Sequence, residues 1–219
     1  MKKYSCVLFD LDGTLANTFP GIFHSYQYAA KMMELSLPTE QIVGELIGAP
    51  LTEVYEKKIG LNDNDVPSAI RHYREYYADK GMKEVEPYSG MKETLAKLKN
   101  SGFQLGVTTL KKESFAREIL DILGFTQYFN IIIGMDDKDV LTKSDMIKRA
   151  LQILQKSKNE TLLVGDSSYD AIGAFEAGID FIGVTYGFGF KCEKDLKAYD
   201  NIGAINNPNK LLDYLNQIK

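Results

Sequence analysis

The second half of the chain alternates between short apolar segments that favour strands and longer segments with helical periodicity. The strand-like segments are residues 103–108, 129–133, 161–164 and 181–184. Between them, apolar residues recur at helical spacing, for example at Phe115, Ile119 and Ile122, and a glycine follows as a stop signal. Alternation of this kind predicts an α/β fold, in which right-handed crossovers build a Rossmann-like parallel sheet flanked by helices.

One more strand is predicted at the start of the chain, far from the others in sequence. Residues 7–9 form an apolar run, but the next strand-like segment comes only about ninety residues later. The segment between them has helical periodicity, and a connection of that length needs structure of its own. We therefore predict an α/β core of residues 1–15 and 87–219, with a small α-helical domain, residues 16–86, inserted after the first strand. Residues 86–90, Glu-Pro-Tyr-Ser-Gly, are expected to form the returning hinge.

The composition argues against several classes of function. With 219 residues and 44% hydrophobic residues, the chain can bury a sizeable core. Its net charge of −4 predicts neither a nucleic-acid partner nor an anionic membrane surface. No apolar run approaches the roughly 18 residues of a membrane span, so none is predicted. Two cysteines do not make a disulfide framework, which favours a reducing compartment and a cytoplasmic protein.

The first predicted strand ends in two carboxylates, in the sequence Asp10-Leu11-Asp12-Gly13-Thr14. Side chains alternate along a strand, so Asp10 and Asp12 point the same way if the strand geometry persists. Ligands of open α/β sheets bind outside the carboxyl ends of the strands. Two acids at such a position can bind a hard cation, attack a substrate or move a proton.

With this motif the chain resembles the haloacid dehalogenase-like superfamily of phosphotransferases, and the resemblance covers essentially the whole chain. Three further positions match the family's pattern in the same order. They are a hydroxyl at the end of the second core strand, a lysine before a core helix, and the acidic pair of Gly165-Asp166-x-x-x-Asp170. The resemblance implies that the inserted helices form a C1-type cap, which closes over the site and selects the substrate.

The hydroxyl and the lysine each leave a choice between two residues. Thr108 and Thr109 both end the second core strand, and the spacing usual in the family favours Thr109 as the phosphate-binding residue. A hydroxyl at a strand end and the adjacent N–H groups can donate to a phosphate oxygen. Leu110 departs from the Asn or Ser that the family often carries there. For the lysine, Lys143 is favoured over Lys138, which comes too early relative to the helix.

The resemblance implies a role for each of these residues in phosphoryl transfer. Asp10 would be the nucleophile and a metal ligand. Asp12 would be the general acid and base, and its backbone carbonyl would also bind the metal. Asp166 would ligate Mg²⁺ with Asp170 behind it, and Lys143 would neutralise the nucleophile and bind a phosphoryl oxygen. Magnesium offsets the repulsion between a carboxylate and a phosphate ester, and the covalent intermediate divides one slow hydrolysis into two steps.

Several segments look most like the phosphoglycolate-phosphatase group of this superfamily. One is Ile47-Gly48-Ala49-Pro50-Leu51, a loop whose Gly48 is expected to face the site and contact the substrate. Asn17 departs from the group, because relatives commonly carry Asp there. The expected function is Mg²⁺-dependent hydrolysis of a small phosphorylated metabolite by a monomer or homodimer.

Other activities stay open on the same motifs. A β-phosphoglucomutase-like phosphomutase shares the core motifs, but its hinge histidine would match Ile22, and His24 lies two residues later. 5′-Nucleotidase and pyrophosphatase activities occur on similar frameworks. Asp12 argues against displacement of halide, which needs no acid for the leaving group. A non-catalytic binding protein predicts loss of a core acid, whereas every core acid is present.

The inserted segment is rich in tyrosine. These side chains are expected to pack between helices rather than to form a ligand-binding cluster. They are Tyr26, Tyr28, Tyr55, Tyr73, Tyr76 and Tyr77.

Overall fold

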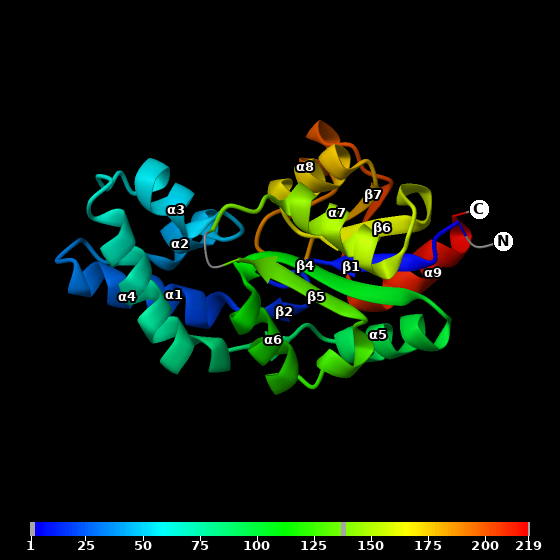
Figure 1. Cartoon of the computed structure of the whole chain (residues 1–219), viewed down its shortest axis with the longest axis horizontal. Helices are drawn as coiled ribbons and strands as arrows, with labels where there is room; N and C mark the ends of the chain where they lie inside the picture. Colours follow the sequence, from blue (N-terminus) through cyan, green and yellow to red (C-terminus); the bar gives the residue numbers. More distant parts are fainter. Residues whose placement is uncertain (1–2, 137–138, 219) are drawn as a thin grey trace.

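A six-stranded parallel sheet forms the centre of the part of the chain that the computed structural model describes, residues 3–136 and 139–218. The strands are β1 (Cys6–Phe9), β4 (Gln104–Lys112), β5 (Ile131–Met135), β6 (Thr161–Gly165), β7 (Asp180–Val184) and β8 (Gly203–Ile205). Their order is β5-β4-β1-β6-β7-β8, so the first strand in the sequence lies in the middle of the sheet (Figure 1). This arrangement confirms the predicted α/β fold.

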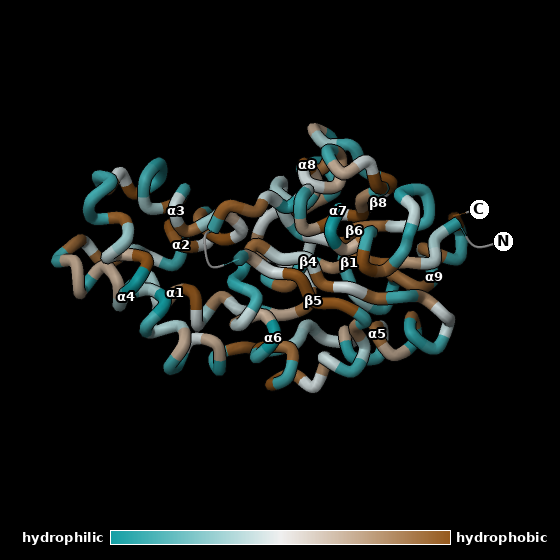
Figure 2. The backbone as a smooth tube through the Cα atoms, viewed as in Figure 1, coloured by the Kyte–Doolittle hydropathy of each residue, from teal (hydrophilic) through white to brown (hydrophobic). Residues whose placement is uncertain are grey.

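Helices cover both faces of the sheet (Figure 1). One layer contains α5 (Met91–Asn100), α6 (Glu113–Ile122) and α9 (Leu211–Gln217), and the other contains α7 (Lys143–Leu154) and α8 (Ser168–Ala177). The side chains of β1 alternate between the layers, because Val7 and Phe9 pack with the first and Cys6 and Leu8 with the second. Both faces of the sheet are therefore buried, as is usual for a parallel sheet between two layers of helices. Figure 2 shows hydrophobic residues along β5.

The helical insert, residues 16–86, projects beyond one end of the sheet (Figure 1). Its helices are α1 (Phe19–Met32), α2 (Glu40–Leu46), α3 (Leu51–Glu53) and α4 (Val66–Asp79), with the shorter turns η1 (Val54–Lys58) and η2 (Gly81–Lys83). The two long helices α1 and α4 pack against each other. The ends of the insert pair as antiparallel strands β2 (Ala16–Asn17) and β3 (Glu86–Pro87), so the chain leaves and re-enters the α/β core at one place.

Three details differ from the expectations. Strand β8 was not predicted, since three residues of sequence Gly-Ala-Ile carry no apolar run. Strand β4 continues past the predicted end to Lys112, and its pairing with β5 shifts register between Thr108 and Lys112. Ile122, expected on the buried face of α6, is 47% exposed because the helix ends there.

The remaining helical turns in the described residues are short. They are η3 (Thr126–Tyr128), η4 (Lys158–Glu160), η5 (Asp195–Ala198) and η6 (Pro208–Lys210). Across residues 3–136 and 139–218, no helix has the length and apolar character that crossing a membrane requires.

Candidate active site

Asp10 follows the central strand β1 directly at its carboxyl end. Its backbone N–H donates to the carbonyl of Val164 in β6 at 2.9 Å, which extends the pairing of the two strands by one residue. The residue is only 7% exposed. Strand β6 ends at Gly165, so its next residue, Asp166, also leaves the sheet at this edge. Two neighbouring parallel strands thus deliver carboxylates to one place.

Three of the predicted acids meet there in a buried carboxylate cluster. Asp10, Asp166 and Asp170 each offer an oxygen, and these atoms lie within 4.8 Å of one another. The ammonium of Lys143 lies 2.6 Å from Oδ1 of Asp10 and 2.6 Å from Oδ1 of Asp170. Lys143 is the first residue of α7 and is buried, while the competing Lys138 lies outside the described residues.

Backbone groups fix the position of Asp166. Its Oδ2 accepts hydrogen bonds from the N–H groups of Phe188 at 2.6 Å and Gly189 at 3.0 Å. Gly13 approaches the same carboxylate so closely, at a φ of 77°, that a Cβ there would overlap it. A Cβ on Gly187 would collide with the same oxygen and with the carbonyl of Gly13. The glycine after Asp12 therefore makes room for the acid of the neighbouring strand.

A helix cap orients Asp170. Ser167 is the N-cap of α8 and Asp170 the third residue of that helix, and together they form a capping box. Oδ2 of Asp170 accepts from the Ser167 hydroxyl at 2.7 Å and from the Ser167 N–H at 3.0 Å. This leaves Oδ1 for Lys143. The Asp170 carboxylate thus lies near the N-terminus of α8 and also belongs to the carboxylate cluster. The sequence was compatible with both roles.

Burial and mutual repulsion shape the protonation of the cluster. Burial, reinforced by the Asp170 carboxylate, raises the pKa of Asp10 well above its ordinary value, although Lys143 acts in the opposite direction. Burial and Asp170 also raise the pKa of Asp166 to about 7, against the two backbone hydrogen bonds that lower it. Burial alone would lower the pKa of Lys143, but the charges of Asp10 and Asp170 outweigh it and raise that pKa.

The residues present fit a divalent cation. Carboxylate oxygens are the ligands that Mg²⁺ and Ca²⁺ take, and the cluster offers one from each of three buried acids. Around the carboxylate cluster and Asp12, the described acids outnumber the lysines that contact them. The acids are Asp10, Asp12, Asp166 and Asp170, and the lysines are Lys111 and Lys143.

Asp12 lies beside the cluster and has different partners. Its Oδ1 accepts from the hydroxyl of Thr18 at 2.5 Å and lies 3.1 Å from the ammonium of Lys111. Lys111, in β4, was not predicted as a site residue. Burial alone would lower the pKa of Lys111, but the Asp12 carboxylate outweighs it and raises that pKa above its usual value. The predicted contact of the Asp12 backbone carbonyl with a metal stays a prediction.

Of the two candidate threonines, Thr109 lines the cavity at the site and Thr108 does not. The Thr109 hydroxyl accepts from the N–H of Lys111 at 3.2 Å. Thr108 is fully buried, and its hydroxyl has no partner within the described residues. Successive side chains of a strand point to opposite faces, so only one of the pair can reach the phosphate position. Thr109 is therefore the better placed of the two, and phosphate binding by Thr109 or Thr108 stays a prediction.

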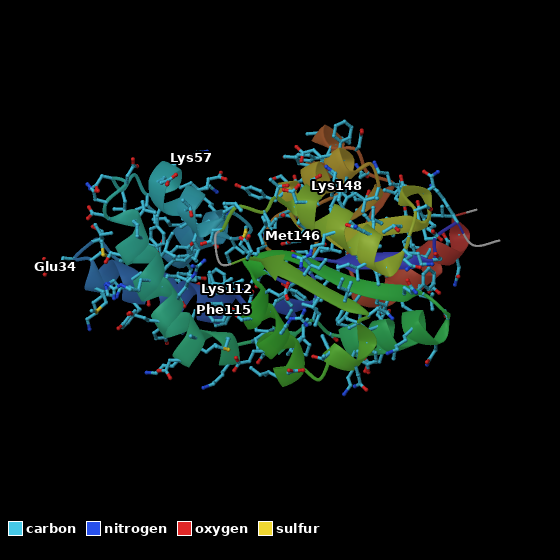
Figure 3. The ribbon with its side chains drawn as sticks, viewed as in Figure 1. Glu34, Lys57, Lys112, Phe115, Met146 and Lys148 are labelled. Carbon is cyan, nitrogen blue, oxygen red and sulfur yellow. The ribbon has the colours of Figure 1, made fainter. Side chains whose placement is uncertain are left out.

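A cavity of about 90 Å³ joins the acids to the helical insert. The core lines it with Asp10, Asp12, Lys143 and Thr109, among others, and Figure 3 labels Lys112 and Phe115 where the core faces the insert. The insert contributes the whole loop from Ile47 to Leu51, which includes Gly48 at a φ of 92°. A Cβ on Gly48 would lie 3.5 Å from the Cβ of Ser167, so this loop packs directly on the start of α8.

The tyrosines of the insert pack between helices, as predicted, but some of them also line the cavity. Tyr26 and Tyr73 do pack on each other, with ring centroids 4.8 Å apart, and Tyr73 stacks on Tyr77 at 5.8 Å. The same three rings also line the cavity. The pattern of helical spacing could not separate the two roles, because these rings lie between the helices and the cavity.

Two further contacts join the insert to the core at the rim of the cavity. Nη2 of Arg74 in α4 lies 2.7 Å and 2.8 Å from the two carboxylate oxygens of Asp139, which follows β5. The hydroxyl of Tyr169 in α8 donates to Glu53 in α3 at 2.9 Å. Neither pair was predicted, since each joins residues that are remote in sequence.

Comparisons with known proteins agree with this architecture. The family model of haloacid dehalogenase-like hydrolases matches residues 7–184. A 5′-nucleotidase from Pseudomonas aeruginosa is 33% identical over 198 residues, which cover 90% of this chain and 89% of that protein. Pyrophosphatase PpaX from Halalkalibacterium halodurans is 31% identical and covers 96% of both chains.

A solved structure supports the same assignment. The crystal structure of a predicted phosphatase from Clostridium acetobutylicum has a TM-score of 0.92 and 32% identity, over 98% of this chain and 99% of that one. The match spans the α/β core and the helical insert alike. These findings confirm the predicted family and class of enzyme: the chain belongs to the haloacid dehalogenase-like hydrolases, as a phosphatase of that family.

Proposed function

We propose that this protein hydrolyses a small phosphate monoester in a Mg²⁺-dependent reaction that passes through an aspartyl phosphate on Asp10. The observation that carries this proposal is the junction of a buried carboxylate cluster with Lys143 and Thr109 at one end of a cavity. The Lys143 ammonium lies beside Asp10, and Asp166 and Asp170 supply the further carboxylates that a metal would need. Asp12 lies at the same cavity but outside the cluster, free for a different task.

In the first step, a carboxylate oxygen of Asp10 attacks phosphorus while the bond from phosphorus to the ester oxygen breaks. Asp12 gives its proton to that departing oxygen, so the alcohol leaves neutral. Lys143 lies 2.6 Å from Asp10 and offsets charge on the phosphoryl oxygens, and the Thr109 hydroxyl donates to one of them.

In the second step, the Asp12 carboxylate takes a proton from water, and the water oxygen attacks phosphorus. The bond from phosphorus to the Asp10 oxygen breaks, which releases inorganic phosphate, restores the Asp10 carboxylate and leaves Asp12 protonated for the next cycle. The tyrosines and the Gly48 loop of the insert exclude bulk water from the cavity while the ester reacts.

Asp10, Asp166 and the Asp12 backbone carbonyl would hold Mg²⁺, with Asp170 supporting them from behind. When bound, the ion would supply positive charge that offsets the repulsion between the carboxylates and the phosphate. The buried acid cluster supports a cation, and the preference for magnesium follows from the oxygen ligands and the phosphate substrate.

We further propose that residues 16–86 act as a C1-type cap and that the substrate is a small phosphorylated metabolite of the phosphoglycolate kind. The small volume of the cavity, about 90 Å³, supports a small substrate. The second candidates are nucleoside monophosphates and pyrophosphate, which are favoured by the names of two relatives, a 5′-nucleotidase and a pyrophosphatase.

The full chain with MgCl₂ should release phosphate from p-nitrophenyl phosphate. EDTA and the variant Asp10→Asn should each abolish turnover, while Asp63→Asn, an exposed aspartate of the insert, should leave it unchanged. A panel of 2-phosphoglycolate, nucleoside 5′-monophosphates and pyrophosphate then ranks the substrates by kcat/KM. Full activity of Asp10→Asn would overturn the covalent mechanism, and preference for a nucleotide would overturn the substrate proposal.

A further inference from the structure

Lys111 connects the proton-transfer carboxylate of the core to a ring of the helical insert. Its ammonium lies 3.1 Å from Oδ1 of Asp12 and 4.3 Å from the centre of the Tyr77 ring. The Lys111 side chain is only 7% exposed, and Tyr77 is fully buried on α4. A buried ammonium over an aromatic face is held by a cation–π interaction, which is stronger away from water.

Local backbone geometry brings Lys111 to this position. Strand β4 loses its regular pairing with β5 between Thr108 and Lys112, and such irregularities re-aim side chains at the end of a strand. Phe115 packs against the other side of the contact, with its ring 5.3 Å from that of Tyr77. The core therefore supports Tyr77 and Lys111 together.

The contacts of Asp12 are unequal at its two oxygens. Oδ1 accepts from Thr18, just before α1, and from Lys111. Within residues 3–136 and 139–218, no hydrogen bond engages Oδ2, and the nearest contact of the Lys111 ammonium is with Oδ1. The carboxylate is thus anchored through one oxygen, and the other is left to carry the proton.

We propose that Lys111 is a positioning residue for Asp12, and that it does this only while Tyr77 of the insert covers it. Thr18 and Lys111 fix Oδ1, so that Oδ2 points at the ester oxygen during proton transfer. When α4 moves away, Lys111 loses its aromatic partner and Asp12 loses one of its two anchors. Proton transfer is thereby tied to closure of the insert. This inference rests on the proposed function, since it assigns a task within that reaction.

Leaving groups of different basicity separate this role from a structural one. Phenyl phosphate and p-nitrophenyl phosphate have nearly the same shape, but phenoxide is the more basic leaving group and depends more on a proton from Asp12. We expect Lys111→Met to lower kcat/KM for phenyl phosphate about tenfold more than for p-nitrophenyl phosphate, a part of the effect that general acids supply. Lys111→Arg keeps a positive charge beside Asp12, so its kcat/KM for phenyl phosphate should stay much closer to the wild-type value.

Tyr77→Leu should reproduce the same selective loss in weaker form, and adding it to Lys111→Met should bring little further loss, because both act through Asp12. Lys92→Met, an exposed lysine on α5, is the matched control and should change neither substrate. Melting temperatures of all variants identify any that fail to fold, and in that event Lys111→Gln and Tyr77→Met, which remove the charge and the ring at similar volume, carry the comparison with the same expected losses.

Equal losses on the two substrates would overturn the inference, because they would mean a structural role or a direct substrate contact. An unchanged Lys111→Met variant would overturn it as well. Inactivity of the wild-type protein on both substrates would instead contradict the proposed function itself.

Discussion

At the scale of single residues, one ammonium group serves two buried carboxylates. Lys143 lies 2.6 Å from both Asp10 and Asp170, and all three side chains are buried. Removing one partner of a buried ion pair leaves the other charge uncompensated in a medium that solvates it poorly. Lys143 therefore supports the fold in addition to its proposed role in the reaction, and the two effects can be measured separately.

We expect Lys143→Met to destabilise the metal-free protein by about 3–5 kcal/mol, the usual cost of breaking a buried ion pair. Turnover of p-nitrophenyl phosphate should fall about 100-fold or more, as it does when a group that stabilises transition-state charge is lost. Urea denaturation in EDTA and steady-state kinetics measure these effects. Lys148→Met, on the exposed side of the same helix (Figure 3), is the control, and an equal effect there would contradict the assignment.

The pKa of Asp166 predicts how stability depends on pH in EDTA. Burial raises this pKa from its ordinary value of 3.8 to about 7, so the folded state favours the protonated acid. The resulting stability is fully present below the unfolded pKa and is lost as the pH rises through 7, on the order of 1 kcal/mol per pH unit.

Melting temperatures in EDTA should therefore fall between pH 5.5 and pH 8 in the wild type and fall less in Asp166→Asn. Added Mg²⁺ at pH 8 should stabilise the wild type more than the variant, because the ion replaces the proton. Parallel curves for the two proteins would contradict this assignment of the site.

Most of the acidic site and Lys143 could be predicted from sequence, while Lys111 and the aromatic lining of the cavity could not. Asp10 and Asp166 each follow an apolar strand, and parallel strands end at a common edge, so local patterns suffice to bring them together. Lys111 follows a leucine in what resembles a solvated strand end. Its burial depends on a register shift and on Tyr77, and neither is visible in neighbouring residues.

At the scale of elements, the start of α8 does two things at once. Its capping box satisfies backbone groups at the helix N-terminus, and the same Asp170 carboxylate reaches Lys143 with its other oxygen. Close packing supports this arrangement, since a Cβ on Gly165 would overlap the Asp170 carboxylate and one on Gly173 would lie 2.6 Å from the Lys143 side chain. Helix termination and charge placement are therefore coupled.

Ser167→Ala removes the cap and should destabilise the protein by about 1 kcal/mol. It should also lower turnover several-fold, because Asp170 loses the hydroxyl that holds its Oδ2. Ser157→Ala breaks another capping box that begins with serine, at η4, and is the matched control. Chemical denaturation measures the stability of each variant, and steady-state kinetics measures its kcat. Equal losses of both stability and kcat in the two variants would contradict a link between the α8 cap and catalysis.

Elements with strong periodicity were easier to predict than those fixed by tertiary pairing. The predicted helix around Ile147 corresponds to α7, whose boundaries are marked by the Thr142 cap. Strand β8 has only three residues and exists because β7 offers an open edge beside it. Its sequence alone has too little apolar character to indicate a strand.

At the scale of the whole molecule, the insert is fastened to the core around the cavity. Arg74 reaches Asp139 across the rim, and Tyr169 reaches Glu53 on another side. Both contacts are partly exposed, so each stabilises the closed arrangement modestly. For the cap proposed above, such contacts would adjust how often the insert is closed without determining the fold of either part.

Arg74→Ala should shift the insert toward the open state and raise KM about threefold to tenfold, with a smaller change in kcat. Asp139→Ala should do the same, because it removes the other partner. Arg71→Ala removes contacts with Glu75, Ser68 and His72, all within α4 itself, and should leave KM unchanged. If Arg74 instead binds substrate directly, Asp139→Ala would free it and lower KM.

The paired β2 and β3 strands have a consequence for engineering. Because Asn17 and Glu86 pair directly, a foreign segment with similarly spaced ends could replace residues 19–85, after the Thr18 anchor of Asp12, without breaking the parallel sheet. Such a chimera would keep every acid but would lack the aromatic ring above Lys111. The chimera would then gain a new substrate specificity but position Asp12 poorly, unless the new segment also carried an aromatic ring at the place of Tyr77.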